Sequence, residues 1–456
     1  MNIKSKFENY VILNKNKIKI SSKDIKKGDI FLALKGNKTH GSKFIRSSIN
    51  SGAKYCVTDD IKFSENKKVI YVENISQYLI DLAKIKRELY RGIVIGITGS
   101  AGKTTLKETL AFFLNKKFLI SYSIKSYNNE LGVLVSLLNL DLKSNYSIFE
   151  IGTNNFGEIK HLTQIVKPTE IFITNIQSTH LQNFKTKKNI AKEKSDIFIY
   201  KYNKQNRKLY LNPINTYENY IYTKAHKDKK LKVVLIGKKS KKYFIKKIIN
   251  KKNYYEVIFF INKKLITLEV KSLIMFRVIN LLFCYAFFSE NSINYDIIKN
   301  KHKNLKPVSG RGLGHNLIIN KNKIKVIDEA YNANPDTMYQ SVEYFNNLKK
   351  INNKKILILG DMNELGKNSD IMHTQLIKHI DTLSFRFIIL CGEFMQRSIK
   401  KLKNLSNEFI FLDNKNKIMK FLKKNIHKND IILIKCSNST EVNRFTRDLL
   451  KKGNVV

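Results

Sequence analysis

The sequence predicts an α/β protein built from three domains, because its length and the alternation of its segments both indicate this. At 456 residues the chain is longer than one hydrophobic core usually serves. Apolar strand-like runs alternate with helical patterns from residue 92 to about 307, and a second alternating series begins at about 308. We therefore expect a small α/β domain over 1–88, a central domain with a mainly parallel sheet over 89–307, and a second doubly wound domain over 308–456.

The N-terminal segment predicts a small α/β unit. Gly28 and Asp29 form a turn before an expected strand at 30–34, and residues 43–50 have the pattern of a helix that ends at Gly52. The segment has no catalytic spacing of its own, so we expect it to be a binding module.

The most informative stretch is 92–114. An apolar, β-branched run at 93–97 predicts a strand buried on both faces, and leucines at helical spacing over 106–114 predict the helix that follows. Between them lies a turn containing Gly99 and Gly102. Glycines let backbone N–H groups approach phosphate oxygens, and the helix N-terminus favours negative charge.

The turn reads G-x-x-G-K-T, a shortened variant of the P-loop, because Ile97 stands where the strict motif has its first glycine. A strand, a Lys-Thr pair and a helix all stand in the required order. We therefore expect nucleotide binding, with Lys103 at the outer phosphates and Thr104 on Mg²⁺.

The net charge of +47 would ordinarily suggest nucleic acid or an anionic membrane as partner. The lysines, however, are spread through every segment, and the chain is also rich in Asn, Ile, Tyr and Phe. This bias is typical of an AT-rich genome, so we expect no dedicated nucleic-acid surface.

The cysteines and the hydropathy pattern indicate a cytoplasmic protein. The four cysteines are far apart and form no C-x-x-C pair, which fits neither a disulfide framework nor a zinc site. Residues 1–20 lack the apolar core of a signal peptide. The most apolar segment, 273–288, is interrupted by Arg277 and Asn280 and is short for a membrane span, so we expect a core helix.

Polar residues follow each expected strand of the central domain. The strand at 147–151 contains Glu150, and the strand at 170–176 is followed closely by His180. Because ligands collect at the carboxyl ends of parallel strands, we expect both side chains to converge on the nucleotide phosphates, where they suit a second Mg²⁺ or its water. Residues 201–300 are rich in Lys and Asn and predict only strands and helices of uncertain order.

The C-terminal domain shows the same arrangement of a strand followed by a polar loop. Its expected strands are 324–327, 355–359, 386–390, 408–412 and 431–434, with a helix at 336–348. The first strand ends in the polar loop 328–336, which has Pro335 at a first-turn position of the helix. So many polar residues at a strand's carboxyl end favour a site over a simple helix cap.

Taken together, these motifs resemble the Mur ligase family, and within it the members that add D-alanyl-D-alanine. The matching segments are TGSAGKTT at 98–105, YNNELGV at 127–133, EIGTNNFGEI at 150–159, TNIQSTHL at 174–181, AKEKSDIF at 191–198, SGRG at 309–312, IDEAYNANPD at 327–336 and GDMNELG at 360–366, followed by His373. The loop IDEAYNANPD is the most specific, because sibling ligases carry other loops there. The resemblance covers most of the chain outside about 201–300.

The resemblance implies an ATP-dependent ligase that joins D-alanyl-D-alanine to UDP-N-acetylmuramoyl-tripeptide through an acyl phosphate. It also implies an N-terminal UDP-substrate domain, a central P-loop ATPase domain, a Rossmann-like C-terminal domain, two Mg²⁺ ions and a monomer. Such a ligase would act in peptidoglycan synthesis, and so in cell-wall formation, cell shape and division.

The same resemblance implies roles for individual residues. The implied catalytic residues are Lys103, Glu150, His180 and Lys194, the last carbamylated, and the implied Mg²⁺ ligands are Thr104, Glu150, His180 and Lys194. The implied ATP contacts are Gly99, Ser100, Ala101, Gly102, Lys103, Thr104, Thr105, Asn280, Arg311 and Asp328. The implied substrate contacts are Asn128, Asn129, Glu130, Tyr331, Asn332 and Asn334.

Four segments depart from the family's pattern. The G-x-H-N-x-x-N segment keeps only Asn280 and has Phe276 at the His position, and the N-A-D-D-like stretch becomes Leu211-Asn-Pro-Ile. Both concern the adenine pocket. The K-G-S-R segment becomes Lys435-Cys-Ser-Asn, which concerns a third-domain substrate contact, and residues 39–41 lack the usual Asp.

Two other functions stay open at this point. One is another amide ligase, either a diaminopimelate-adding Mur enzyme or a folylpolyglutamate synthase, against which the absence of D-N-P-R and the presence of YNANP argue. The other is a non-catalytic or nucleic-acid-binding P-loop protein, suggested by the charge of +47. The third residue of the tripeptide, diaminopimelate or Lys, is not readable from the sequence.

Overall fold

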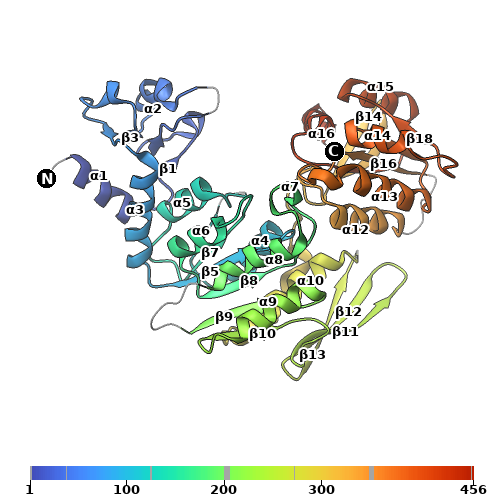
Figure 1. The fold of residues 1–456 in the computed structure, drawn as a ribbon, viewed down its shortest axis with the longest axis horizontal. Helices are drawn as coiled ribbons and strands as arrows, with labels where there is room; N and C mark the ends of the chain where they lie inside the picture. Colours follow the sequence, from blue (N-terminus) through green and yellow to red (C-terminus); the bar gives the residue numbers. More distant parts are fainter. Residues whose placement is uncertain are drawn as a thin grey trace.

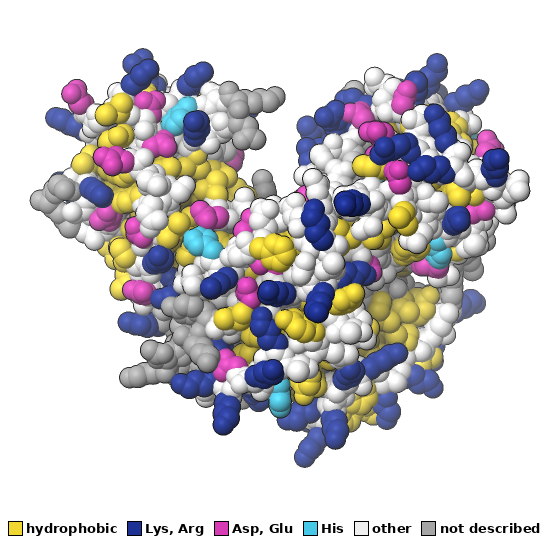
Figure 2. Space-filling view, viewed as in Figure 1, with side chains coloured by type: hydrophobic (Ala, Val, Ile, Leu, Met, Phe, Trp, Pro, Cys, Tyr) yellow, Lys and Arg dark blue, Asp and Glu magenta, His cyan; other side chains and the backbone are white. Residues whose placement is uncertain are grey.

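Four sheets organise the part of the chain that the computed structural model describes, namely residues 3–36, 39–123, 126–199, 206–271, 273–348, 354–452 and 454–455. Figure 1 shows the N-terminal and C-terminal sheets standing on either side of the central domain. The space-filling view shows a wide notch between these two outer parts (Figure 2). The expected α/β class with three domains is confirmed.

The N-terminal sheet is parallel, in the order β1-β2-β3-β4. Its elements are α1 Ile3–Leu13, β1 Ile18–Lys19, β2 Ile30–Leu32, α2 Ile45–Asn50, β3 Tyr55–Thr58, β4 Val69–Tyr71 and α3 Ile75–Leu89. The expected helix at 43–50 begins as a 3-10 turn, Gly41–Phe44, because the His40 ring accepts from the Ser42 amide and caps that turn.

The central sheet is also parallel, in the order β10-β9-β8-β5-β7-β6. Its strands are β5 Ile93–Thr98, β6 Ile120–Tyr122, β7 Tyr146–Glu150, β8 Glu170–Ile173, β9 Arg207–Leu211 and β10 Leu231–Leu235. The helices of this domain are α4 Lys103–Leu114, α5 Glu130–Leu138, α6 Glu158–Val166, α7 Leu181–Phe184, α8 Lys187–Ser195, α9 Thr216–His226, α10 Met275–Glu290 and α11 Asp296–Lys301. The β5 strand lies between β8 and β7, so the ends of these three strands are neighbours.

An antiparallel meander, which the sequence did not resolve, packs against α10. It consists of β11 Tyr243–Asn250, β12 Tyr255–Ile261 and β13 Lys264–Val270. In β12 only alternate residues are fully buried, but Ile258 and Phe260 on the other face are also apolar. This second set of apolar residues hides the period-two alternation that would mark a half-buried strand.

The C-terminal sheet has the order β18-β17-β16-β19-β15-β14-β20 and is parallel except at β14 and β20. Its strands are β14 Leu313–Ile319, β15 Asn322–Glu329, β16 Lys355–Gly360, β17 Phe387–Cys391, β18 Phe409–Phe411, β19 Ile431–Lys435 and β20 Asn454–Val455. Its helices are α12 Pro335–Asn346, α13 Ser369–Asp381, α14 Glu393–Lys400, α15 Lys415–Asn425 and α16 Glu441–Lys452. The β14–β15 hairpin was not predicted, because its turn residues Asn320 and Lys321 adopt positive φ without the usual glycine.

Two adjacent cations of α3 join the N-terminal domain to the central one. Lys86 is fully buried, and its Nζ donates to the carbonyls of Val11, Asn14 and Leu138 at 2.7 to 2.9 Å. Arg87 donates to the carbonyls of Val166 and Lys167. These carbonyls lie at the ends of α1, α5 and α6, where a cation satisfies the unpaired C=O groups and complements the helix dipole.

Replacing Lys86 by Met is expected to lower the free energy of unfolding by about 2 kcal/mol, because buried carbonyl oxygens would lose their donor. Thermal unfolding of the full chain should show a lower midpoint. The matched control is Lys84→Met, which removes an exposed lysine from the same helix and should leave the midpoint unchanged. An unchanged midpoint for Lys86→Met would contradict this role.

The surface charge and the helix lengths give two further observations. On the face shown in Figure 2, Lys and Arg side chains are scattered over all three domains and form no single stripe. Within the described part of the chain, no helix combines the length and the apolar character needed to span a bilayer.

Candidate active site

The carboxyl ends of β5, β7 and β8 carry the segments that the sequence singled out. The phosphate loop 99–102 follows β5, Glu150 ends β7, and residues 174–180 follow β8. Because these strands are parallel neighbours, their ends lie at one edge of the sheet. The third-domain segments SGRG and IDEAYNANPD reach the same edge, as the contacts below show.

The glycines of the phosphate loop are required by its backbone. Gly99 has φ 141°, and a Cβ there would lie 1.9 Å from Thr174 Oγ1. Gly102 has φ 81° and precedes α4 as its N-cap, in the left-handed conformation that favours glycine. The Ser100 amide donates to the Asn175 carbonyl and the Ala101 amide to Asn175 Oδ1, so the loop is fastened to the end of β8.

A short polar network lies at the start of α4. Thr104 Oγ1 donates to Glu150 Oε2 at 2.7 Å and is 3.1 Å from Ser126 Oγ. Asn128 Nδ2 donates to Glu150 Oε1 at 2.7 Å. Glu150 is 1% exposed. Each of its carboxylate oxygens accepts a hydrogen bond, and the two donors come from different segments of the domain.

Arg311 brings the third domain into this network. Its Nη2 donates to Ser126 Oγ at 3.3 Å, across 185 positions of sequence. Its guanidinium lies over the Tyr331 ring, 4.4 Å from the ring centroid, which holds the planar side chain against the polar loop after β15. The third domain thus contributes a cation beside the start of α4.

Asp328 holds the segment that carries Arg311. Its Oδ2 accepts from the Gly310 amide and its Oδ1 from the Ala330 amide, both at 3.0 Å. The Gly312 amide donates to the Asp328 carbonyl at 2.7 Å. Asp328 therefore fixes the backbone on both sides of Arg311.

Lys103 and Lys194 lie in surroundings that disfavour their positive charge. Burial lowers the pKa of Lys103, with the Glu150 carboxylate opposing this shift and the Arg311 guanidinium adding to it. Lys103 Nζ donates to the Gly99 carbonyl at 2.8 Å. Burial also lowers the pKa of Lys194 well below its ordinary value, and the charge of Lys103 adds to that shift. Lys194 is 1% exposed.

Glu193, next to Lys194, fastens α8 to the loop after β7. Its Oε2 accepts from the Gly157 amide, while its Oε1 accepts from the Ile159 amide and from Thr153 Oγ1. Glu193 thus accepts hydrogen bonds from backbone amides at the start of α6, which have no partner within that helix. These bonds also fix α8, the helix that carries Lys194.

Comparison with known proteins agrees with this geometry. Three family models match the chain in order: "Mur ligase family, catalytic domain" over residues 16–92, "Mur ligase middle domain" over 97–288, and "Mur ligase, glutamate ligase domain" over 316–438. A curated relative from Rickettsia prowazekii is 30% identical over 437 residues, which is 95% of either chain. The chain belongs to the Mur ligase family.

Two Mur ligases are similar to this one over nearly their full length. The relative from Rickettsia prowazekii and another from Buchnera aphidicola of Acyrthosiphon pisum are both named UDP-N-acetylmuramoyl-tripeptide–D-alanyl-D-alanine ligase. The Buchnera protein is 31% identical over 446 residues, covering 96% of this chain and 94% of its own.

Solved structures show the same fold. MurF from Acinetobacter baumannii has a TM-score of 0.80 at 22% identity, covering 95% of this chain and 93% of its own. MurF from Thermotoga maritima, solved in complex with ADP, has a TM-score of 0.78 at 24% identity, covering 97% and 98%. The three-domain Mur ligase fold therefore extends over at least 95% of this chain.

In this Mur ligase, His180 contacts the third domain. Its Nδ1 lies 2.5 Å from Glu364 Oε2, and the Gln182 amide donates to the Glu364 carbonyl. Both His180 and Glu364 have positive φ, 52° and 65°. Among the described residues, no three His, Cys, Asp or Glu side chains are grouped to hold a metal ion. The expected convergence of His180 with Glu150 on Mg²⁺ stays a prediction.

The expected substrate residues fall into two groups in the structure. Asn129 caps α5 and Glu130 is 3.0 Å from His161, so both stand at the start of that helix, whereas Asn128 contacts Glu150. Asn334 caps α12 and is 3.5 Å from Gln177 of the central domain. Tyr331 and Asn332 lie in the loop before α12, where Tyr331 is partly exposed and the Asn332 carbonyl accepts from Lys435. Their contacts with substrates stay predictions.

The residues of the adenine-side segments differ in burial, since Leu211, Asn212 and Pro213 are buried, Phe276 is partly buried and Ile214 is exposed. Asn280 is 4% exposed in α10, and its Nδ2 has no hydrogen-bond partner among the described residues. Its expected contact with ATP stays a prediction. His373, which followed the GDMNELG match, is fully buried and supports that loop, because its Nε2 accepts from the Met362 amide.

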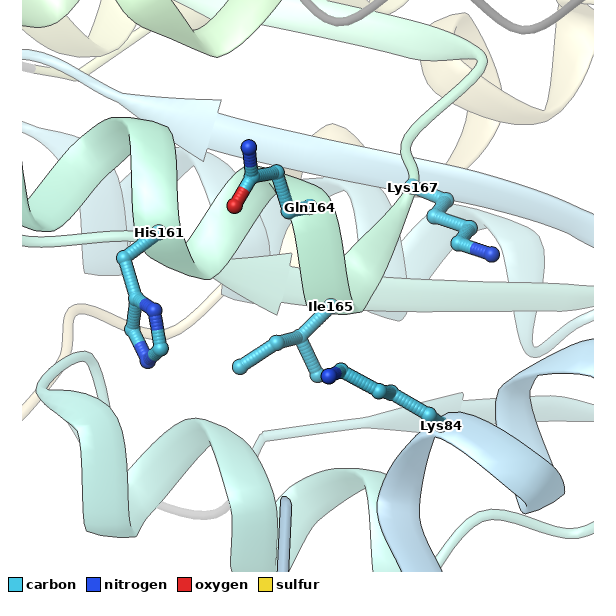
Figure 3. A pocket seen from close by; sticks show the side chains of 5 residues that line it. All are labelled: Lys84, His161, Gln164, Ile165 and Lys167. Atoms are coloured by element: carbon cyan, nitrogen blue, oxygen red, sulfur yellow. The ribbon is translucent and has the colours of Figure 1, made fainter. Parts of the chain in front are cut away.

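A surface pocket of about 270 Å³ lies between α6 and α3 (Figure 3). Its lining residues His161, Gln164 and Ile165 come from α6, Lys167 follows that helix, and Lys84 comes from α3. None of the predicted site residues lines it, so the polar network at the start of α4 remains the candidate active site.

Sequence reasoning missed three polar residues of this site. Ser126 links Thr104 to Arg311, Glu364 pairs with His180, and Arg277 contacts the segment that carries Arg311. Ser126 immediately precedes the YNNELG motif and Glu364 lies inside GDMNELG, so motif position was the available signal. For Arg277 the sequence shows only that it interrupts an apolar run.

Proposed function

We propose that this Mur ligase joins D-alanyl-D-alanine to UDP-N-acetylmuramoyl-tripeptide at the expense of ATP, in the cytoplasmic synthesis of peptidoglycan precursors. The substrate pair is supported by the full-length relatives that bear this name. The reaction type is supported by one structural observation above all. The chain Arg311–Ser126–Thr104–Glu150 places a third-domain cation and a buried carboxylate together at a phosphate loop.

The chemistry requires activation of a carboxylate, because a free carboxylate has no good leaving group. A carboxylate oxygen of the tripeptide attacks the γ-phosphorus of ATP and ADP leaves, giving an acyl phosphate. The D-alanyl-D-alanine amine then attacks the acyl carbon, loses a proton and expels inorganic phosphate. Negative charge accumulates on phosphoryl oxygens in the first step. Lys103 and Arg311 are the side chains of this site that would offset it.

The residues at the start of α4 fit Mg²⁺, which prefers oxygen ligands and needs few of them from the protein, because it keeps waters and binds substrate phosphates. Thr104 supplies a hydroxyl oxygen and Glu150 a buried carboxylate, 2.7 Å apart. Bound Mg²⁺ would neutralise charge on the phosphates. We assign Thr104 and Glu150 to one ion and keep His180 and a carbamylated Lys194 as proposed ligands of the second.

The N-terminal domain is proposed to bind the UDP part of the substrate, and the ATP contacts are proposed at residues 99–105, Asn280, Arg311 and Asp328. Asn128 to Glu130 and the loop containing Tyr331, Asn332 and Asn334 are the proposed substrate contacts. We propose a monomer with no nucleic-acid partner.

Phosphate release from ATP tests this function directly. The assay uses the full chain, ATP, Mg²⁺ and UDP-N-acetylmuramoyl-tripeptide with either Lys or diaminopimelate as third residue. Release is expected to require both the tripeptide and D-alanyl-D-alanine, and L-alanyl-L-alanine serves as the matched control. Release that is indifferent to the dipeptide would contradict the proposal.

A further inference from the structure

The segment between the central and third domains holds Arg311 between two glycines in the left-handed conformation. Gly310 has φ 72° and Gly312 has φ 87°, and a Cβ on Gly310 would lie 2.8 Å from Tyr331 Cβ. Asp328 accepts from the Gly310 amide through Oδ2, as described above. The backbone at this point is therefore fixed from the third domain.

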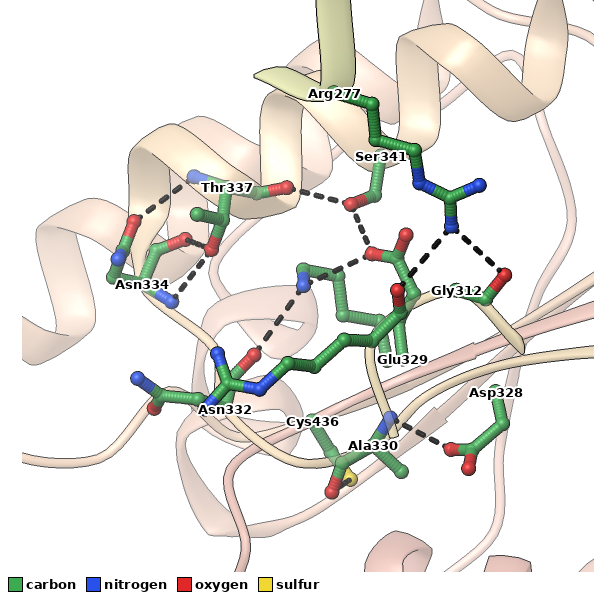
Figure 4. Close-up of polar contacts among 12 residues, drawn as sticks. Arg277, Gly312, Asp328, Glu329, Ala330, Asn332, Asn334, Thr337, Ser341 and Cys436 are labelled. Atoms are coloured by element: carbon green, nitrogen blue, oxygen red, sulfur yellow. Dashed lines mark hydrogen bonds and ion pairs between the residues drawn. The ribbon is translucent and has the colours of Figure 1, made fainter. Parts of the chain in front are cut away.

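Arg277 fixes the same backbone from the central domain. It lies in the first turn of α10, and its Nη2 donates to the Gly312 carbonyl at 3.1 Å and to the Arg311 carbonyl at 3.4 Å (Figure 4). Arg277 is half-buried, and this burial lowers its pKa while the nearby Glu329 opposes that shift. Burying a cation costs free energy unless the cation is paired, and the two carbonyls and Glu329 provide these partners for Arg277.

The space beside Gly312 is filled by Arg277. A Cβ on Gly312 would lie 2.7 Å from Arg277 Nη2 and 3.3 Å from Glu329 Oε1. The same residues line a small cavity of about 180 Å³. Glu329 in turn accepts from Lys435 Nζ at 3.1 Å and from Ser341, which ties it to β19 and α12 of the third domain. Gly312 thus lies between a cation of one domain and an anion of the other.

We propose that Arg277 is a positioning residue for Arg311. By holding the Arg311 backbone between the two domains, Arg277 sets the affinity of the site for the ATP phosphates. The inference rests on the proposed function for the role of Arg311 itself. Arg277 holds the backbone of Arg311 and Gly312 through their two carbonyls. The position of that backbone determines where the Arg311 side chain lies relative to Ser126 and the phosphate loop. Small displacements of a charge-stabilising group in a preorganised site have large effects on the reaction.

A double-mutant cycle on nucleotide affinity tests this inference. The dissociation constant of a non-hydrolysable ATP analogue with Mg²⁺ is measured for the wild type, Arg277→Met, Arg311→Ala and the double variant. We expect Arg277→Met to weaken binding about tenfold in the wild-type background and less than about twofold in the Arg311→Ala background, because coupled residues are not additive. Equal weakening in both backgrounds would overturn the proposal.

Two control variants separate positioning from charge, and thermal unfolding reports on folding. Arg277→Lys, which can still donate to both carbonyls, should keep affinity within about threefold, while the exposed neighbour Lys306→Met should leave it unchanged. If Arg277→Met fails to fold, as thermal unfolding would show, Arg277→Gln takes its place in the cycle. Binding of the ATP analogue does not require ligase turnover, so the double-mutant cycle tests the role of Arg277 separately. If phosphate release did not depend on the dipeptide, the proposed function would be refuted, but the result of the cycle would still stand.

Discussion

Replacing Lys103 by Met is expected to lower the turnover of ATP-dependent phosphate release by about a thousandfold, since one preorganised charge at a transferring phosphoryl group contributes on this scale. Lys103 lies at the first position of α4, directly after Gly102, and its pKa is affected by both Glu150 and Arg311.

The measurement is steady-state phosphate release with both substrates, with turnover and KM for ATP determined separately. Lys117→Met, an exposed lysine just beyond the same helix, should retain wild-type turnover. A Lys103→Met enzyme that keeps more than a tenth of wild-type turnover would show that the phosphate loop does not carry the chemistry we assign to it.

Replacing Lys194 by Ala is expected to lower ligase turnover by about a hundredfold, the scale on which metal sites lose activity when a supporting group is removed. Carbamate formation needs the unprotonated amine. Burial holds the pKa of Lys194 well below its ordinary value, so the neutral amine is a larger fraction of this side chain than of an ordinary lysine at the same pH. The carbamate would convert a buried amine into an anion able to bind Mg²⁺.

Bicarbonate dependence separates a carbamate from a structural lysine. Wild-type turnover should fall when CO₂ and bicarbonate are removed and should return when bicarbonate is added, whereas the Lys194→Ala enzyme should not respond. Lys192→Ala, an exposed lysine on the same helix, should behave like the wild type. Bicarbonate-insensitive wild-type turnover, or full activity in Lys194→Ala, would refute the carbamate.

The parts of the site that could be predicted from sequence are the ones encoded within a single short segment. The phosphate loop and Glu150 each follow or end an apolar strand, so hydrophobic pattern and glycine spacing were sufficient to place them at one sheet edge. Lys194 could be found only by resemblance to the family, because nothing in its local pattern distinguishes it from the many solvated lysines of this chain.

The contacts between domains could not be predicted, because they join segments far apart in sequence with no local signal. Arg311 and Ser126 are 185 positions apart, and the His180–Glu364 pair depends on how the third domain sits on the central one. The antiparallel meander was missed for another reason, since apolar residues on the less buried face of β12 obscure the strand period. Arg277, read as an interruption of a core helix, is instead a polar contact at that helix's first turn.

In the proposed reaction, ATP activates a tripeptide carboxylate, and the dipeptide amine then attacks the acyl phosphate. Tripeptide carrying ¹⁸O in both oxygens of its reacting carboxylate reports on this sequence of steps, by mass spectrometry of the inorganic phosphate released. We expect one ¹⁸O atom in each phosphate and one left in the new amide, with labelled phosphate formed only when D-alanyl-D-alanine is present. Unlabelled phosphate accompanying peptide-bond formation would contradict the acyl-phosphate account.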